Sequence, residues 1–268
     1  MIVKKKTLKD ILFIDIETVS EHATYQEVRP EMQALWARKS LRVDREVDHT
    51  DEEHYAASYV GRAGIFAEFA KVACITVGYL VKATDRGPAL RIKTFGGHDE
   101  QALLTSFAEL LDRHFDNPDQ YYLCGHNVKE FDVPFLCRRM VIHGLYLPRM
   151  LNIAGKKPWQ VGHLLDTMEL WRFGDYKNYT SLALLAATLH IKSPKDDIDG
   201  SQVGHVYWKE DDLSRIVHYC EKDVVTVAQI VMRFAGAELI AEDAIEYVPF
   251  EPIVSPETTD KPEDADTH

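Results

Sequence analysis

The sequence predicts an α/β fold in which one mixed, five-stranded sheet is flanked by helices on both faces. Two observations carry this prediction. Short apolar runs rich in β-branched residues alternate along the chain with longer segments of helical period. Two neighbouring runs are joined by a turn, which is typical of a hairpin and makes the sheet mixed. A length of 268 residues and a hydrophobic fraction of 46% allow one domain of this class with a complete core.

Five segments have the length and composition of strands. The first, ILFIDI, is a short apolar run that predicts a buried strand. The second and third form the hairpin, because Asp85, Gly87 and Pro88 lie in the turn between them. The fourth, YYLC, is short, and the fifth leads directly into a helix within LLDTMEL. The predicted strands are 11–16, 72–82, 90–96, 121–124 and the beginning of 164–170.

Helices are predicted after or between these strands, and the clearest has acidic residues in its first turn, where the helix dipole favours them. The predicted helices are 26–40, 51–60, 99–115, 132–144, the end of 164–170, 180–190 and 211–236. Residues 20–70 are polar and lie between the first two strands, so we expect a helical insertion, a lid or subdomain near the end of the first strand. A single domain is thus expected over 1–250.

The charge is concentrated in part at the C-terminus. Residues 251–268 contain six acids and one lysine, and their proline and threonine content predicts an acidic, disordered tail. The net charge of the whole chain is −12, which leaves −7 for the remainder. Tight binding of a polyanion through a large basic patch is therefore not expected. If the substrate is a polyanion, bound cations must contribute to holding it.

The four cysteines are scattered without a C-x-x-C pair, which suits reduced thiols in a cytoplasmic protein better than a disulfide frame or a zinc site. No apolar run reaches the roughly 18 residues of a membrane span. The start of the chain is not predicted to be a signal peptide, because Asp10 and Asp15 interrupt its apolar run and no small-residue cleavage site follows. We therefore expect a cytoplasmic protein with no membrane partner.

The first candidate site is the pair Asp15 and Glu17. The two residues are two apart on a predicted strand, so both side chains project from one face. They lie at its carboxyl end, where open α/β sheets bind ligands. The pair alone has a structural alternative, a polar strand end or a helix cap beside Thr18, and roughly seven acid-x-acid pairs arise by chance in such a composition. A carboxylate that ends a buried strand is nevertheless costly without a cation.

Two further motifs carry acids. In GHNVKEFDVPFLCRRM, Asp132 precedes a predicted helix, so it is either a site residue or a helix N-cap. If it is a cap, Asn127 is a turn former and Phe131 a core aromatic. In HYCEKD, Tyr219 and Asp223 are four apart on one face of the last predicted helix. The alternative for this motif is a surface acid beside a half-buried tyrosine.

In this order and spacing, the motifs Asp15-x-Glu17, His126-Asn127-x-x-x-Phe131-Asp132 and Tyr219-x-x-x-Asp223 resemble those of the DEDD exonuclease superfamily. The tyrosine points to its DEDDy branch. The surrounding residues (FIDIET, GHNVKEFDVPFL and HYCEKDV) are similar to the proofreading exonuclease domain of family-B DNA polymerases, and most similar to stand-alone predicted exonucleases of that type. The resemblance covers about 10–235.

The resemblance implies a ribonuclease H-like fold and a 3′–5′ exonuclease. The expected reaction releases nucleoside 5′-monophosphates from the 3′ end of DNA, with single strands favoured, by a two-metal-ion mechanism. The motifs do not distinguish DNA from RNA, so an exoribonuclease remains an alternative. A non-catalytic nucleic-acid-binding module is a second alternative.

A sister branch has a histidine five residues before the last aspartate, where this chain has His218. Helix geometry separates the two branches. With Leu213 at 0° on a helical wheel, Tyr219 lies at about 240° and Asp223 at about 280°, beside the apolar stripe, whereas His218 lies at about 140° on the far side. We therefore expect Tyr219 to serve the site and His218 to face solvent. The stripe comprises Leu213, Ile216, Val217, Cys220, Val224, Val227 and Val231.

The four carboxylates are expected to hold two divalent ions, because all-oxygen ligands suit Mg²⁺ or Mn²⁺. Asp15 is expected to bridge both ions, Glu17 and Asp223 to complete one site, and Asp132 to hold the other ion partly through water. Tyr219 is expected to orient the attacking water. Further candidates are named for substrate contacts and structural roles. They are Thr18 and Asn127 at the terminal nucleotide, Phe131 against a base or in the core, Lys195 at the scissile phosphate or in solvent, Arg138 and Arg139 at the nucleic-acid backbone, and Asp166 as a helix cap.

Overall fold

The computed structural model describes residues 3–43, 52–84, 87–177, 179–192 and 197–254. Its centre is a mixed sheet with the strand order β5-β4-β1-β2-β3-β6. Strand β2 runs antiparallel to both β1 and β3, and the remaining neighbours pair in parallel. The strands are β1 Ile11–Ser20, β2 Ala70–Thr84, β3 Gly87–Gly96, β4 Tyr122–Gly125, β5 Leu164–Asp166 and β6 Ile245–Tyr247.

The predicted mixed sheet flanked by helices is confirmed, but the count of five strands is one too low for the described residues. The additional strand, β6, has three residues and pairs with the edge of β3. Strand β1 also continues four residues beyond its predicted end at 16, because Glu17–Ser20 still pair with β2. The acidic pair therefore lies within a paired strand instead of at a strand terminus.

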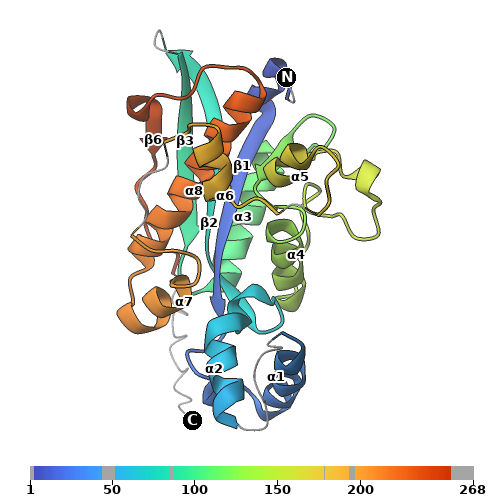
Figure 1. Cartoon of the computed structure of the whole chain (residues 1–268), viewed down its shortest axis with the longest axis vertical. Helices are drawn as coiled ribbons and strands as arrows, with labels where there is room; N and C mark the ends of the chain where they lie inside the picture. The colour runs from blue at the N-terminus through green and yellow to red at the C-terminus, as the bar shows by residue number, and fades with distance from the viewer. Residues whose placement is uncertain (1–2, 44–51, 85–86, 178, 193–196, 255–268) are drawn as a thin grey trace, which may run out of the picture.

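Helices cover both faces of the sheet (Figure 1). Helices α3 and α4 pack on one face and α8 and α6 on the other. The principal helices are α1 Pro30–Val43, α2 Glu52–Arg62, α3 Glu100–His114, α4 Asp132–Ile142, α5 Thr167–Arg172, α6 Leu182–Thr188, α7 Val203–His205 and α8 Leu213–Phe234. Short turns of helix lie at Lys5–Asp10, Tyr25–Glu27, Ala63–Ile65, Pro158–Gln160 and Glu242–Ala244, and a π-helical turn follows α7 at Val206–Glu210. None of the helices described is long and apolar enough to cross a membrane.

The alternation of β1 decides where the acidic pair points. Leu12, Ile14 and Ile16 belong to the core beneath α3 and α4, whereas Ile11 and Phe13 belong to the core beneath α8. Side chains two apart on a strand share a face, so Asp15 and Glu17 continue the row of Ile11 and Phe13 toward α8. The strand thus presents its carboxylates to the helix that carries the third motif.

Helix α8 packs on the sheet through the apolar stripe that the sequence predicts, and all seven predicted stripe residues are buried. Gly78 of β2 lets the helix approach closely, because a Cβ there would lie 2.8 Å from Ile92 Cδ1 and 2.9 Å from Val224 Cγ1. The helix starts at Leu213 because Asp212 caps it by accepting the backbone N–H of Arg215. This close packing fixes the position of the last motif relative to β1.

The segment between β1 and β2 has an apolar core of its own. The indole of Trp36 on α1 meets the ring of Tyr59 on α2 edge-on, at 5.5 Å between ring centroids. Phe69, just before β2, packs against the same indole. The segment meets the sheet at the end of β1, where Thr18 Oγ1 donates to the carbonyl of Gly64 at 2.7 Å. Helices α1 and α2 therefore stand next to the acidic end of β1 (Figure 1).

The predicted C-terminal tail is described only in part. Within the predicted tail, 251–254 lie in the described part, and the backbone N–H of Ile253 donates to the carbonyl of Gly96 at 2.8 Å. The rest of the tail, 255–268, lies outside the described residues.

The prediction that Arg139 contacts a nucleic-acid backbone is wrong, because its guanidinium is buried in an ion pair with Glu100.

Candidate active site

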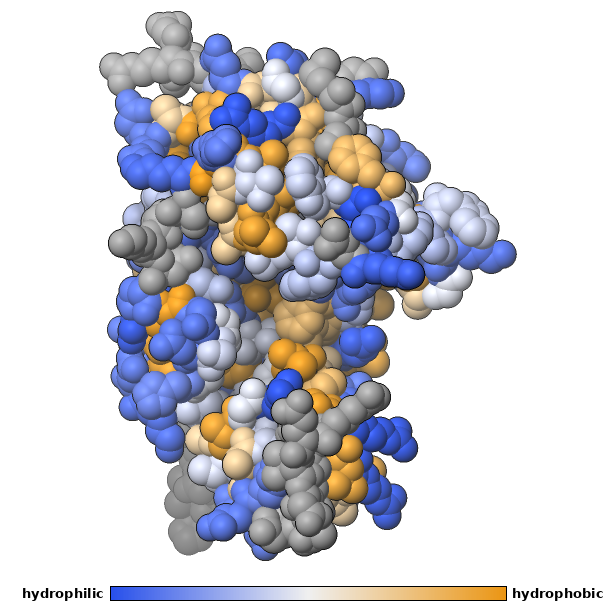
Figure 2. All heavy atoms as spheres, in the orientation of Figure 1, coloured by the Kyte–Doolittle hydropathy of each residue, from blue (hydrophilic) through white to orange (hydrophobic). Residues whose placement is uncertain are grey.

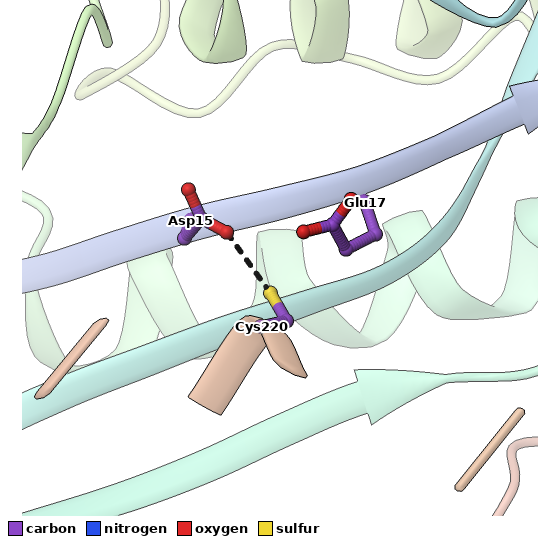
Figure 3. Close-up of side chains that lie close together, drawn as sticks. All are labelled: Asp15, Glu17 and Cys220. Carbon is purple, nitrogen blue, oxygen red and sulfur yellow. Dashed lines mark hydrogen bonds between the residues drawn. The ribbon is translucent and has the colours of Figure 1, made fainter. Parts of the chain in front are cut away.

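Asp15 and Glu17 project from β1 toward α8 (Figure 3). The register of β1 against β2 shifts between Glu17 and Thr18, which is the signature of a β-bulge. Bulges re-aim side chains and are common beside functional sites. The parallel pairing of β1 with β4 ends at Phe13, so no strand of the described residues pairs with β1 beside Asp15 and Glu17 on that side. The two carboxylates therefore lie where the sheet opens.

Cys220 of α8 faces the pair directly. Its thiol donates to Oδ2 of Asp15 at 3.3 Å, and its sulfur and one carboxylate oxygen each from Asp15 and Glu17 lie within 4.8 Å of one another (Figure 3). Burial raises the pKa of this thiol, so it remains a protonated donor. The sequence analysis placed Cys220 only in the apolar stripe. The available signal was its position three residues before Asp223, which puts both on neighbouring parts of one helix face.

Asp132 reaches the same place from the other side of the sheet. It is the first residue of α4, whose N-cap is Phe131, so the alternative of an N-cap at Asp132 is not met. Its side chain is 4% exposed. The carboxylate forms backbone hydrogen bonds at Ile16 and at Asp132 itself, which lower its pKa, but burial outweighs them and raises the pKa to about 7. Because Ile16 lies between Asp15 and Glu17, Asp132 is held beside both.

Electrostatic repulsion shows that Asp223 belongs to the same group. The pKa of Asp15 is well above its usual value because of burial first and then repulsion from Asp132 and Asp223. The pKa of Glu17 is also raised, by burial and then by Asp15, Cys74, Asp223 and Asp132. Four carboxylates from β1, α4 and α8 therefore gather at one place.

Three of these four carboxylates have no cationic side chain paired with them in the described part of the chain. No lysine or arginine described there forms an ion pair with Asp15, Glu17 or Asp132. Buried carboxylates that repel one another are costly unless they take up protons or cations. Carboxylate oxygens are the ligands that hard divalent cations prefer. The donor set therefore fits divalent metal ions such as Mg²⁺ or Mn²⁺.

Tyr219 and His218 occupy the positions on α8 that the helical wheel predicts. His218 is exposed, whereas Tyr219 is partly buried against an apolar cluster that includes Val203 and Val206. The side of α8 with Tyr219 therefore faces α7, and the imidazole of His218 faces solvent. The structure agrees with this geometric part of the prediction.

A groove of about 430 Å³ begins beside Glu17 and Thr18. One wall is the end of α2 and the turn after it, with Val60, Arg62 and Ile65, and the opposite wall is the α7 region. Phe131 lines it from the side of α4. Figure 2 shows this face of the molecule hollowed above the α1–α2 pair. Cationic and apolar groups thus share the groove next to the carboxylates, and its remaining lining in the α7 region includes Gly204, His205, Trp208 and Lys209.

The remaining predicted substrate contacts lie in different places. Thr18 lines the groove, although its hydroxyl is already bonded to Gly64. Asn127 adopts a left-handed backbone with φ 64° and lines a different hollow, beyond the loop before α4. Phe131 both lines the groove and packs on Phe135 at 5.6 Å between ring centroids. Lys195 lies outside the described residues.

The helix-cap prediction for Asp166 is confirmed. Its carboxylate accepts the backbone N–H groups of Met168 and Glu169 at the start of α5. It also accepts those of Asn127 and Lys129, at 3.0 and 3.2 Å. Asp166 therefore fixes the loop that leads to Asp132. Arg138, which was predicted to contact the nucleic-acid backbone, is exposed on α4.

Comparisons with family models and with solved structures both give matches. A family model described as a predicted 3′-5′ exonuclease related to the exonuclease domain of PolB matches residues 65–243, which include Asp132, Tyr219 and Asp223 but begin after β1. Curated proteins give no match. Among solved structures, the chain is similar to the family B DNA polymerase from the hyperthermophilic archaeon Pyrobaculum calidifontis, with 15% identity and a TM-score of 0.49. That match covers 83% of this chain and 24% of the polymerase chain, so this chain spans about a quarter of its length.

Proposed function

Because the chain belongs to the family of predicted 3′-5′ exonucleases related to the exonuclease domain of PolB, we propose that it is a metal-dependent enzyme that removes nucleoside 5′-monophosphates from the 3′ end of DNA, with single strands favoured. The observation that carries the proposal is the gathering of four carboxylates next to a groove that begins at Glu17, three of which, Asp15, Glu17 and Asp132, have raised pKa values. Such a group is expensive to keep in a fold unless it binds cations.

Asp15, Glu17, Asp132 and Asp223 would hold the ions. When bound, two divalent ions would neutralise the phosphate charge that develops during hydrolysis and activate the attacking water. The raised pKa values of Asp15 and Glu17 mean that these carboxylates hold their protons to a higher pH than ordinary acids do, so cation binding competes with protons for them. Affinity for the ions is therefore expected to rise with pH.

Tyr219 would orient the attacking water through its hydroxyl. Its position supports this role, because it lies one helical turn before Asp223 and is partly buried. A hydrogen bond from a neutral phenol suits positioning better than proton abstraction, since an ordinary tyrosine has a pKa of about 10. The expected contribution is to geometry in the transition state.

The groove beside Glu17 would receive the terminal nucleotide. Its lining combines apolar surface with cations: Phe131 and Ile65 can contact the base and sugar, and Arg62 and Lys209 can contact phosphate. Direct phosphate contacts by a few cations, aided by metal ions, reconcile a polyanionic substrate with a chain of net charge −12.

The proposal is tested with a single-stranded DNA oligonucleotide labelled at its 5′ end, incubated with Mg²⁺ or Mn²⁺. The expected result is progressive shortening from the 3′ end with release of nucleoside 5′-monophosphates, abolished by EDTA and by Asp15→Asn. Asp116→Asn, at an exposed aspartate of the turn after α3, is the matched control and should retain activity.

Three outcomes of this experiment would contradict the proposal. Degradation from the 5′ end would overturn the polarity. Faster degradation of a matched RNA strand would reassign the substrate to RNA. Binding of the strand without any product, with either ion, would show a non-catalytic module.

A further inference from the structure

Four aromatic side chains stand exposed on the segment between β5 and α6 and on the turn before β5. The exposed fractions are 75% for Trp159, 76% for Phe173, 83% for Tyr176 and 66% for Tyr179. Aromatic rings carry a large apolar area and are normally buried in part. A group of exposed rings in one region marks an interaction surface more often than chance exposure.

One shared hollow places Phe173 beside Tyr176, and a second hollow joins Tyr176 to Pro158, the neighbour of Trp159 in the chain. A hollow of about 310 Å³ is lined by Tyr176 with Lys156 and Pro158, and an adjoining hollow of about 440 Å³ is lined by Tyr176 with Phe173. Trp159 follows Pro158 directly, and the ammonium of Lys157 lies 5.1 Å from the centre of its ring. We call the surface formed by Trp159, Phe173 and Tyr176 the aromatic face. It lies beside α5, at the edge of the sheet (Figure 1).

The backbone at Phe173 indicates that this exposure has a cost. Phe173 ends α5 in the left-handed conformation with φ 47°, and Gly174 follows with φ 90°. A bulky residue with positive φ is strained, and glycine would be the ordinary choice there. The fold therefore tolerates a strained phenylalanine whose ring gains little from burial. Strain of this kind is typical of binding sites.

The charge of the segment favours an anionic partner. Residues 151–180 contain four lysines and arginines against three acids, in a chain whose net charge is −12. One of the three acids, Asp166, is buried as the cap of α5 and does not contribute to the surface. Arg172 lies near Glu130, at 3.8 Å. Within the described part of the chain, no ion pair includes Lys156, Lys157 or Lys177.

The aromatic face and the carboxylates are connected by one short loop. Asn127 and Glu130 line the hollow of the aromatic face, Phe131 lines the groove beside Glu17, and Asp132 follows immediately. A strand leaving the groove across this loop would arrive at Tyr176. The surface is therefore continuous with the candidate active site.

The same loop is tied to the base of the aromatic face. Nε2 of His126 donates to the carbonyl of Thr180 at 2.8 Å, and its Nδ1 lies 2.9 Å from the hydroxyl of Thr167. Burial lowers the pKa of His126, so its ring is neutral near pH 7. Asp166 holds the loop from the other end through the backbone of Asn127 and Lys129. The loop and the face therefore keep a fixed relation to each other.

From this arrangement we propose that the aromatic face binds single-stranded nucleic acid on the 5′ side of the nucleotides held at the carboxylates. Bases stack on Trp159, Phe173 and Tyr176, and Lys156 and Lys157 contact the phosphates. Successive exposed rings flanked by cations are the usual platform for single strands, because every base has a face to stack. The direction of the strand rests on the proposed function.

The test compares a dinucleotide with a long single strand as substrates. The variant Trp159→Ala/Phe173→Ala/Tyr176→Ala is expected to lower kcat/KM on the long strand by about tenfold or more for each ring lost. It should leave kcat/KM on the dinucleotide within about twofold, because a dinucleotide ends before the face. Trp159→Ala alone keeps the test valid if the triple variant does not fold. Tyr146→Ala is the matched control, since Tyr146 is 61% exposed but belongs to the segment after α4 instead of the segments that carry the aromatic face.

A binding measurement separates this inference from the proposed function. Fluorescence anisotropy of a labelled strand in EDTA needs no catalysis, so weaker binding by the triple variant would support the aromatic face even if the wild type degrades nothing. Lys156→Ala/Lys157→Ala should reduce the slope of log affinity against log salt concentration, whereas the aromatic variant should not. Equal binding and equal long-strand cleavage by wild type and triple variant would overturn the inference and leave the face to a protein partner.

Discussion

Replacing Asp132 by asparagine is expected to make the metal-free protein more stable relative to the wild type as pH rises. Burial raises the pKa of Asp132 from 3.8 to about 7. An acid with a raised pKa in the folded state favours folding at low pH. That contribution is lost as pH rises toward the folded value, because the unfolded chain releases its proton first. An amide in the same position cannot release a proton, so its stability lacks this dependence.

The magnitude follows from the same value. Each unit of pKa corresponds to roughly 1.4 kcal/mol, so the full penalty for ionising Asp132 in the fold is about 4 kcal/mol. At about pH 5 less than half of that penalty is present, and at about pH 8 nearly all of it is. The difference in unfolding free energy between Asp132→Asn and wild type should therefore grow by about 3 kcal/mol over this interval. The substitution also removes the repulsion that Asp132 exerts on Asp15 and Glu17, which further stabilises the variant relative to the wild type at high pH.

The assay is urea unfolding in EDTA, followed by tryptophan fluorescence at the two pH values. Asp116→Asn is the control, and its curve should run parallel to that of the wild type. With saturating Mn²⁺ at about pH 8, the wild type should become more stable than Asp132→Asn, because only the wild type has the full ligand set. If the difference in unfolding free energy between Asp132→Asn and wild type stays constant with pH, burial does not raise the pKa of Asp132 and the prediction fails.

Three further predictions test other parts of the site. Tyr219→Phe should lower nucleotide release by about a hundredfold, and His218→Ala by less than about twofold, and the reverse would assign the positioning role to the histidine. Gly125→Ala should destabilise the fold by about 1–3 kcal/mol in urea titrations, because its Cβ would lie 2.9 Å from the carbonyl oxygen of Ile14; an unchanged midpoint would contradict the close approach of β4 to β1. Mn²⁺ at about a hundred times its Kd should raise the melting temperature of the wild type by about 5 °C or more, and an equal rise for Asp15→Asn would place the ions elsewhere.

Much of the site could be predicted because its residues carry periodic signals. The alternation of β1 put Asp15 and Glu17 on one face, and the 100° spacing of α8 distinguished the partly buried Tyr219 from the exposed His218. These are local rules of strand and helix, which the sequence contains in full. The convergence of the motifs was expected only from the family resemblance, since spacing along the chain does not fix which helix faces which strand.

The features that escaped prediction depend on tertiary packing. Strand β6 has three residues and pairs only because the chain after α8 returns to the edge of β3. Arg139 follows an exposed arginine in the sequence but turns into the core, where Glu100 binds its guanidinium. Cys220 looked like one more apolar stripe residue until its thiol proved to face Asp15. In each case the deciding partner is distant in the chain.

We propose that four carboxylates from β1, α4 and α8 form a metal centre that hydrolyses nucleic acid. The most direct test is anomalous diffraction from crystals soaked with Mn²⁺ and a nucleoside 5′-monophosphate. We expect Mn²⁺ peaks surrounded by Asp15, Glu17, Asp132 and Asp223, with the phosphate of the nucleotide in contact with them and its base in the groove beside Phe131. Peaks elsewhere, or none at these four residues, would contradict the claim.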